Sequence, residues 1–343
     1  MKLGILDQTH LVEGISPAEA FRQTVQMAQF ADQLGLERYW VSEHHGSDVI
    51  VGAAPEVLAS FLLAKTERIK IGTGGVMLTH YAPFKVAEQF KVMSALAPGR
   101  VNLGVGRAPG GAHLSTIALK GGRSLEDGWK RDTEGFPSQI DELLEYMEDE
   151  LPEAHPLSGH LFAAPRIGRK PEIWVLGTSP SSGRMAAEKG LPFAFAQFIQ
   201  YAPGVMEEAI HTYAEHFKPS RYLDSPQALV TMKAIVAESD AEAEYLARSA
   251  LHVDFWKHRS KNERFINPDK ALADVRTEKE WQEVEDLKAT YLIGSKETVT
   301  RQIADLSTRL PIKELMAITP IFDIKKRKRS VELLEEAVKT VGK

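Results

Sequence analysis

The sequence predicts an α/β protein that forms one closed (β/α)8 barrel, a TIM barrel, in a single domain over residues 1–343. Short β-branched and apolar runs alternate with longer amphipathic segments, which is typical of repeated βα units and a parallel sheet. We count eight such units, and eight favour a closed barrel over an open sheet. The length suits one large barrel with insertions, and no linker or internal repeat divides the chain.

The expected elements alternate from the N-terminus onward. The first helix is the clearest, because Ser16 can cap it, Pro17 suits its first turn and Gly35 can end it. The strands are expected at residues 3–7, 39–42, 69–74, 101–106, 172–176, 193–196, 229–236 and 314–318. The other helices are expected at residues 55–65, 83–96, 137–149, 182–189, 203–216, 241–257, 296–310 and 325–341.

Two stretches are too long for a minimal βα unit. Residues 107–135 follow strand four, and residues 256–290 lie between strands seven and eight, so both are predicted to be insertions. The second insertion is rich in charged residues with interspersed aromatic residues. It could be a mobile lid at the mouth of the barrel or a solvated helical excursion without a catalytic part.

Composition excludes several classes of protein. The chain has no cysteine, which rules out disulfides, thiolate metal sites, iron–sulfur clusters and cysteine nucleophiles, so a redox enzyme of this sequence needs an organic cofactor. The 42 basic and 47 acidic residues give a net charge of -5, which argues against a nucleic-acid partner. No membrane span or signal peptide is recognisable, and a cytoplasmic protein is expected.

A basic run at residues 325–329 is the exception to the mild acidity. It opens the last expected helix, whose apolar residues keep helical spacing, so a solvated helix face is favoured over a nucleic-acid-binding tail. Cations at a helix N-terminus are electrostatically unfavourable, and the sequence alone offers no reason for them.

Two adjacent histidines follow strand two in the motif Ser42-Glu43-His44-His45-Gly46. Residues after the strands of such a barrel line its active site, and imidazoles there can transfer protons near neutral pH. Adjacent side chains on an extended segment point to opposite faces, so the pair cannot readily share a metal ion and no metal site is expected. We predict that His44 is catalytic and that the other imidazole is structural, although two structural histidines remain the alternative.

Three loops on neighbouring strands could hold a flat ligand with a phosphate. Gly74 and Gly75 follow strand three and would allow close approach of the backbone, although a strand end that needs only a tight turn is the simpler explanation of these glycines alone. Arg107 follows strand four with a donor fork suited to phosphate. After strand five, hydroxyls and free amides at a helix N-terminus form a potential anion site, although one capping serine would explain the helix start. The residues of this loop are Gly177, Thr178, Ser179, Ser181 and Ser182.

Arg107 and the hydroxyl loop lie on consecutive strands and could bind one phosphate between them. A surface ion pair is the alternative for Arg107. The loops contain neither a Walker sequence nor a Rossmann fingerprint in the right place, so a nucleotide with a single terminal phosphate, such as FMN, suits them better than ATP or NAD.

From residue 1 to about residue 341 the chain resembles the bacterial-luciferase-like family of flavin-dependent monooxygenases. Several separated motifs occur in the family's order, namely residues 3–8, 37–45, 71–76, 102–109, 174–182 and 186–192. The resemblance implies a barrel that binds reduced FMN from a separate flavin reductase, forms a flavin C4a-hydroperoxide with O2 and oxygenates a small organic substrate. It also implies a homodimer through the helices after strands two and three.

The resemblance also assigns roles by position. Arg107 and the hydroxyls of Thr178, Ser179 and Ser182 match residues around the FMN phosphate, with Gly177 and Ser181 in the same loop. Gly74 and Gly75 match a cis peptide against the isoalloxazine ring, and His44 matches the catalytic imidazole beside the flavin.

The chain departs from the light-emitting members at two positions. Gly106 replaces a cysteine before the arginine, and Gln197 replaces a tryptophan after strand six, so light emission is not expected. Gln197 becomes a candidate contact to the flavin or the substrate. Two other functions stay open: hydride transfer with the deazaflavin F420, and non-catalytic flavin binding.

Overall fold

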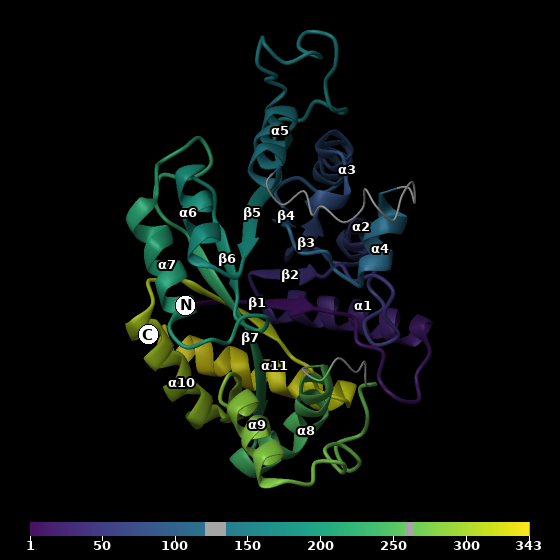
Figure 1. Cartoon of the computed structure of the whole chain (residues 1–343), viewed down its shortest axis with the longest axis vertical. Helices are drawn as coiled ribbons and strands as arrows, with labels where there is room; N and C mark the ends of the chain where they lie inside the picture. Colours follow the sequence, from purple (N-terminus) through teal and green to yellow (C-terminus); the bar gives the residue numbers. More distant parts are fainter. Residues whose placement is uncertain (121–134, 258, 260–263, 343) are drawn as a thin grey trace.

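A computed structural model describes residues 1–120, 135–257, 259 and 264–342. Eight parallel strands form a closed ring surrounded by helices (Figure 1), which confirms the predicted fold class. Each strand pairs with the next, β6 pairs with β7, and β9 pairs with both β7 and β1 to close the ring. The ring strands are β1 (Lys2–Asp7), β2 (Arg38–Val41), β3 (Lys70–Met77), β4 (Val101–Gly106), β5 (Glu172–Gly177), β6 (Phe193–Ala196), β7 (Ala228–Ala237) and β9 (Glu314–Ile318).

All the expected helices are present, with ends shifted by at most two residues. The first begins as predicted, because the Ser16 side chain accepts a hydrogen bond from the Glu19 N–H, and Gly35 ends it with a positive φ of 74°. The helices are α1 (Pro17–Leu34), α2 (Pro55–Lys65), α3 (Pro83–Leu96), α4 (His113–Leu119), α5 (Phe136–Glu148), α6 (Pro180–Glu188), α7 (Val205–His216), α8 (Asp240–Lys257), α9 (Glu278–Lys288), α10 (Lys296–Arg309) and α11 (Ile324–Val341), with a 3-10 turn η1 (Leu78–His80).

The sequence analysis missed three elements. Helix α4 lies in the first expected insertion, of which residues 121–134 are outside the described residues, and helix α9 lies in the second. The third is β8 (Leu292–Ser295), which pairs with the last four residues of β7 and lies outside the ring. This strand escaped prediction because its four residues run directly into α10, whose N-cap is Ser295.

The barrel interior is filled by side chains and is not a pore. Apolar residues on the inner face of the ring form one buried cluster, which includes the rings of Trp40 and Trp174 in edge-to-face contact. Below them, at the N-terminal end of the strands, the buried Arg38 guanidinium bonds Glu314 at 2.6 Å and Asn102 at 2.7 Å. The N-terminal end is therefore closed, and any internal cavity must open at the C-terminal end.

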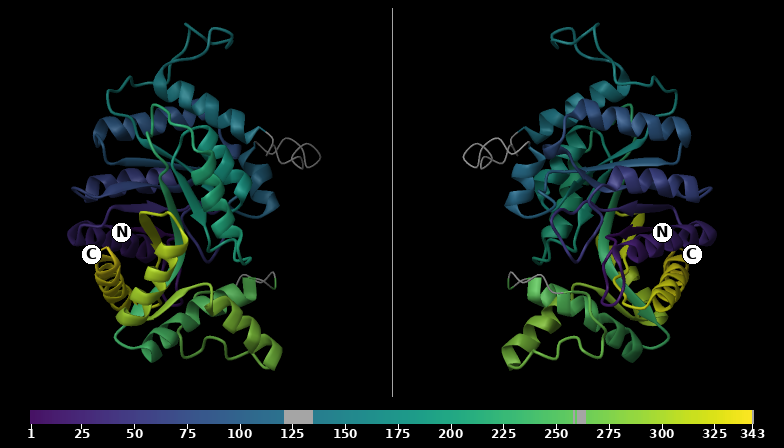
Figure 2. Two further views of the ribbon diagram at one scale, coloured as in Figure 1. Left: turned by 90° about the vertical axis from the view of Figure 1, so that its left-hand side faces the viewer. Right: turned by 90° about the vertical axis from the view of Figure 1, so that its right-hand side faces the viewer.

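A second apolar core joins residues 240–291, called the excursion from here on, to the barrel. Figure 2 shows the helices of this segment in green at the bottom of both views, beside the barrel. Helix α8 and Phe265 pack with Val12 of the loop after β1 and with Ile321 of the loop after β9. The Glu13 N–H also donates to the Phe265 carbonyl at 2.8 Å. The described part of the expected insertion is thus packed against the barrel mouth rather than solvated on all sides.

None of the helices in the described ranges combines the length and the apolar character needed to cross a membrane.

Candidate functional site

A cavity of about 1130 Å³ opens at the C-terminal ends of the barrel strands. Side chains from β1, β2 and β7 reach its inner end, and the loops after β4 and β5 form its rim. The active site of a (β/α)8 barrel is expected at this end, so the cavity is the candidate functional site. Of the residues predicted from sequence, the structure brings these to its wall: Gly74, Gly75, Arg107, Gly177, Thr178, Ser181 and Ser182.

The hydroxyl loop combines helix capping with a polar cavity wall. Ser179 is the N-cap of α6, and its side chain accepts a hydrogen bond from the Ser182 N–H. Its Oγ lies 2.9 Å from the Ser181 Oγ and 3.0 Å from the Ser182 Oγ, while Ser181, Ser182 and Thr178 line the cavity. Ser179 itself is not among the lining residues. The alternative of capping therefore accounts for one serine, and the other three hydroxyls face a space that a ligand could fill.

Gly177 is required for the shape of this loop. A Cβ atom at this position would lie 2.3 Å from the Cβ of Ser182, so any side chain would push α6 away from β5. The glycine allows the first turn of α6 to close on the strand, which places its free amide groups and hydroxyls at the rim. This arrangement favours an anion because the N-terminus of the helix has partial positive charge.

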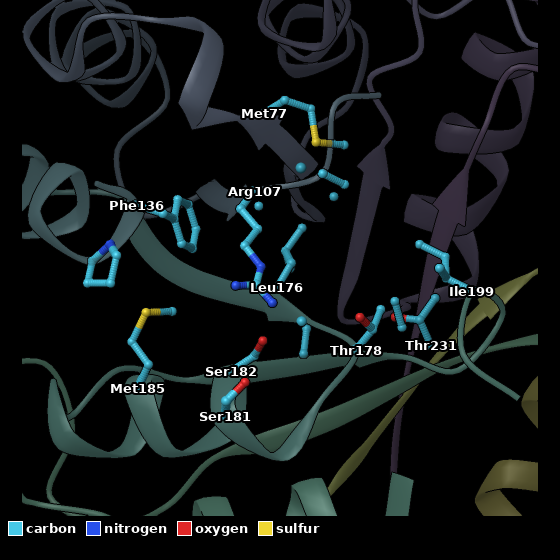
Figure 3. A pocket seen from close by; sticks show the side chains of 18 of the residues that line it. Met77, Arg107, Phe136, Leu176, Thr178, Ser181, Ser182, Met185, Ile199 and Thr231 are labelled. Carbon is cyan, nitrogen blue, oxygen red and sulfur yellow. The ribbon is translucent and has the colours of Figure 1, made fainter. Parts of the chain in front are cut away.

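Arg107 lies opposite the hydroxyl loop. Its side chain extends across the cavity toward Ser181 and Ser182 (Figure 3). Within the described part of the chain, Arg107 has no hydrogen-bond or ion-pair partner, so the alternative of a surface ion pair finds no support there. An exposed guanidinium aimed at a helix N-terminus is a suitable site for a doubly charged phosphate.

The wall beside the phosphate site is flat because it consists of backbone. The peptide bond between Gly74 and Gly75 is cis, the geometry that the family resemblance implies. A Cβ on Gly75 would lie 2.4 Å from Leu176 Cδ1, and one on Gly74 would lie 2.8 Å from Leu6 Cδ1. A Cβ on Gly75 would also lie 2.7 Å from the Gly104 carbonyl oxygen, a backbone atom that cannot move aside, so glycine is required at this position. Gly74 and Gly75 both line the cavity without a side chain.

His44 and His45 have different surroundings, as expected for neighbours on an extended segment. The His44 Nδ1 lies 3.1 Å from the Ser42 Oγ, and burial, with Lys257 and His45 nearby, lowers its pKa to about 4. The imidazole is therefore neutral at pH 7. His44 is not among the residues that line the cavity described above, so its predicted catalytic role stays a prediction.

His45 belongs to a network that joins three loops. Its Nε2 lies 2.7 Å from Oε1 of the fully buried Glu43, which also accepts a hydrogen bond from the Tyr81 hydroxyl at 2.8 Å. The other carboxylate oxygen accepts from the Met77 N–H at 2.9 Å, and the His45 N–H donates to the Gly110 carbonyl at 2.8 Å. The loops after β2, β3 and β4 are held together in this way, which is a structural role for the second histidine.

The sequence analysis singled out Gln197, which does not line the cavity, and missed several apolar residues that do. Gln197 is buried and is not among the lining residues, although Ala196 and Phe198 on either side of it are. The wall also includes residues that the sequence analysis did not single out. Alternation along β7 could have identified Thr231, but the others come from distant elements: Leu6, Trp40, Met77, Phe136, Met185, Phe198 and Ile199.

In the parts of the chain that the structure describes, no group of three or more histidine, aspartate or glutamate side chains is placed to hold a metal ion.

Comparison with known proteins identifies the family. The sequence profile of the luciferase-like monooxygenases matches residues 1–311. The chain belongs to the luciferase-like monooxygenase family. This confirms the resemblance that the motifs predicted, and it makes the protein an oxidoreductase that acts with O2.

Several similar proteins match nearly the whole chain. The uncharacterized protein YceB of Bacillus subtilis is 38% identical over 97% of this chain and 98% of its own. The N-acetyl-S-alkylcysteine monooxygenase of the same organism is 36% identical over 98% of both chains. Among solved structures, apo-MsnO8 is 32% identical with a TM-score of 0.86, covering 98% of this chain and 97% of its own.

More distant structures share the fold and differ in cofactor. The oxygenating constituent of 3,6-diketocamphane monooxygenase from Pseudomonas putida, in complex with FMN, is 21% identical with a TM-score of 0.73, covering 99% of this chain and 98% of its own. An F420-dependent secondary alcohol dehydrogenase is 15% identical with a TM-score of 0.70, covering 98% of both chains. At these identities the likeness establishes the barrel alone, so the choice of cofactor must rest on the site.

Proposed function

We propose that this protein is the oxygenase component of a two-component FMN-dependent monooxygenase, which receives reduced FMN from a separate flavin reductase and oxygenates a small organic substrate. The observation that supports FMN is the pairing of a phosphate site with a flat backbone wall in one cavity. A flavin mononucleotide has a single terminal phosphate and a planar ring, which match these two features.

Residues of the rim would bind the phosphate. The Arg107 guanidinium supplies charge and a donor fork, and the hydroxyls of Thr178, Ser181 and Ser182 supply further donors at the N-terminus of α6. The isoalloxazine would lie against Gly74 and the neighbouring glycine, where no side chain keeps it away from the backbone. When bound, reduced FMN supplies the reaction with O2, through the C4a-hydroperoxide that the family resemblance implies.

The remaining walls would exclude water. The apolar part of the wall includes Leu6, Trp40, Met77, Leu176 and Ile199. Figure 3 shows the side chains of Met77, Leu176 and Ile199 around the cavity. An apolar enclosure protects reactive species from hydrolysis and strengthens the few polar contacts inside it. His44, which we propose as the catalytic imidazole although it does not line the cavity, is neutral at pH 7, so its ring is able to exchange a proton or donate a hydrogen bond.

A stopped-flow experiment tests this function. Chemically reduced FMN is mixed with the protein and air-saturated buffer, and the near-ultraviolet absorbance is followed. We expect a transient flavin adduct that lives longer than free reduced flavin, with a shorter lifetime in His44→Ala. Oxidation at the rate of free flavin, with no adduct, would refute the proposal.

The competing cofactor is tested by titration. FMN and F420 are added separately to the protein while the intrinsic tryptophan fluorescence is recorded, because Trp40 lies in the cavity wall. We expect tighter binding of FMN. Tighter binding of F420 would favour hydride transfer with that cofactor, and stoichiometric FMN binding without any O2-dependent adduct would favour a flavin-binding protein.

We also propose a homodimer through α2 and α3. Both helices expose large apolar side chains to solvent: Val57 (65% exposed), Phe61 (51%), Val92 (47%) and Leu96 (75%). A groove between α1 and α2 continues this surface and is lined mainly by apolar residues. Contiguous exposed apolar surface of this kind is typical of a protein interface, and a second copy of the chain would cover it.

A further inference from the structure

Ser42 and His44 form a pair at the end of β2. The Ser42 Oγ lies 3.1 Å from the His44 Nδ1, a normal hydrogen-bond distance, and Ser42 is 4% exposed. The backbone fixes the pair, because the Ser42 N–H donates to the Asp7 carbonyl at 3.2 Å and the His44 N–H donates to the Gly52 carbonyl at 2.9 Å. The hydroxyl and the ring therefore meet in one defined geometry.

The hydroxyl proton of Ser42 has one available acceptor. Among the described residues, the Ser42 hydroxyl has no hydrogen-bond partner other than the His44 Nδ1. If Nδ1 bore the ring proton and donated it to Oγ, the buried hydroxyl proton would be left without an acceptor, which is unfavourable. If the hydroxyl donates to Nδ1, the buried hydroxyl proton is satisfied, and a neutral ring must then carry its own proton on Nε2.

We propose that Ser42 is a positioning residue that donates its hydroxyl proton to Nδ1 of His44 and holds the imidazole in the Nε2–H tautomer. The ring is neutral, so the tautomer decides its chemistry. Among the described residues, the charged and titratable groups that act on the ring are Lys257 of α8, His45 of its own loop and His10 after β1. Of these, Lys257 and His45 disfavour a second proton on the ring. Both the burial of the ring and these neighbours keep one proton on it.

The tautomer decides whether His44 acts as a hydrogen-bond donor or as a base. An Nε2–H group is a hydrogen-bond donor, whereas the other tautomer would present the free Nε2 as a base. We therefore infer that His44 donates a hydrogen bond from Nε2 and stabilises negative charge that develops on its neighbour, rather than removing a proton. This consequence rests on the proposed function, but the tautomer itself does not.

The tautomer is measured without flavin. In protein labelled with ¹⁵N-histidine at pH 7, long-range ¹H–¹⁵N spectra distinguish protonated from unprotonated ring nitrogens, and His44→Gln assigns the signals. His216 is an internal reference for the opposite tautomer, because its Nδ1 bonds the Thr212 carbonyl at 3.0 Å and its Nε2 lies 2.7 Å from Nη2 of Arg184. We expect the His44 pattern to be the reverse of the His216 pattern, and matching patterns would overturn the proposal.

Two variants test the role of the hydroxyl. In Ser42→Ala, the ¹⁵N shifts of His44 should move toward each other because the two tautomers exchange, and Ser42→Thr should restore the separation. Ser47→Ala is the matched control, since its hydroxyl accepts only from the Val49 and Ile50 N–H groups of its own turn. Unchanged shifts in Ser42→Ala would refute the positioning role, whatever the outcome of the flavin experiments.

Discussion

At the scale of single residues, Arg107 is the clearest test of the phosphate site. Arg107→Ala should weaken binding of FMN about 10- to 100-fold, because a charge-assisted contact of about 1.5–3 kcal/mol is lost. Riboflavin, which lacks the phosphate, should bind equally to both proteins. Fluorescence titration measures both affinities, and Arg309→Ala on α10 is a control of the same residue type. Equal loss of affinity for riboflavin would show that the residue acts on the ring or the fold instead.

The histidines near the mouth should make the protein sensitive to acid. Burial, and then the nearby charge of Arg327, lower the pKa of His10 to about 3. Burial, and then the charge of Lys257, lower the pKa of His44 to about 4. Both values lie below the ordinary value of 6.5, so between about pH 4 and 6.5 the unfolded chain binds more protons than the native one. As the pH is lowered through this window, the free energy of unfolding should therefore decrease, by up to about 1.4 kcal/mol per pH unit for each ring.

Urea unfolding at several pH values tests this effect. In His44→Gln, the unfolding free energy should depend less steeply on pH between pH 4 and 6.5, by the amount that corresponds to about one proton taken up on unfolding. This change in slope is expected whatever stability the variant loses at pH 7. His160→Gln, in an exposed loop, should leave the slope unchanged. An unaltered slope in His44→Gln would mean that the ring titrates normally in the folded protein.

Sequence reasoning could identify side chains whose chemistry is unusual for their position. Hydroxyls crowded before a helix, paired glycines after a strand and a histidine pair at a strand end all stand out locally. The separate roles of Ser179 and Ser182 could not be predicted, because they depend on how the first turn of α6 closes on Gly177. Phe136 and Ile199 could not be predicted either, since they come from elements that only the closed ring brings together.

At the scale of elements, helix α11 explains how five cations are tolerated at a helix start. The Asp323 side chain accepts hydrogen bonds from the Lys325 and Lys326 N–H groups at 2.8 and 2.9 Å, which caps the helix and adds a negative charge. The basic run is also not wholly solvated. Arg327 points inward, where its Nη2 lies 3.3 Å from Oδ1 of the buried Asp7. The expectation of a solvated face is wrong for Arg327, because its helical phase directs it toward β1.

The cap of α11 can be separated into two contributions. Asp323→Ala should lower the free energy of unfolding by about 1–2 kcal/mol, because two amide groups lose their acceptor. Asp323→Asn keeps the acceptor and removes only the charge, so it should cost less. Thermal and urea unfolding measure both variants, and an equal loss in both would assign the whole effect to the charge.

Long elements were easier to predict than short ones. Helices with a capping serine or an N-terminal proline, such as α1 and α3, begin where the sequence indicates. Strand β8 has four residues and no alternation, and its partner is the end of a strand that the sequence analysis assigned wholly to the barrel. The pairing of β8 depends on how far β7 extends beyond the barrel, and the local sequence pattern of β8 does not encode this.

At the scale of the whole molecule, a buried charge cluster joins the barrel to the 240–291 excursion. The Lys233 ammonium of β7 bonds the Asp254 carboxylate of α8 and lies 3.1 Å from the Tyr291 hydroxyl, which itself donates to Asp254 at 2.5 Å. Burial lowers the pKa of Lys233, whereas the charge and hydrogen bond of Lys233 outweigh burial at Asp254 and lower the pKa of that carboxyl.

Breaking this pair should loosen the excursion. Asp254→Ala leaves a buried ammonium unpaired and should cost about 3–5 kcal/mol, whereas Lys233→Met combined with Asp254→Leu should cost much less. Hydrogen exchange should show faster exchange in α8 for the single variant and near-native protection in the double variant. Uniformly faster exchange over the whole barrel would indicate that the two cores unfold as one unit.

The apolar surface on α2 and α3 makes a prediction about assembly. Phe61→Asp combined with Leu96→Asp should convert a dimer of about 76 kDa, twice the 38.1 kDa chain, into monomers, as measured by light scattering. Trp281→Asp, an exposed aromatic on α9, is the control and should not change the mass. A monomeric wild-type protein would refute the proposed dimer.

Strand β7 has ten residues, of which the first part closes the ring with β6 and β9 and the last four pair with β8. The ring is therefore complete without β8 and the helices around it. Among the described residues, none that lines the cavity lies beyond Thr231, so the excursion can be replaced or resized without altering the cavity wall. The same modularity would let an engineer exchange residues 240–291 between relatives and so change what borders the loops after β1 and β9 on one oxygenating scaffold.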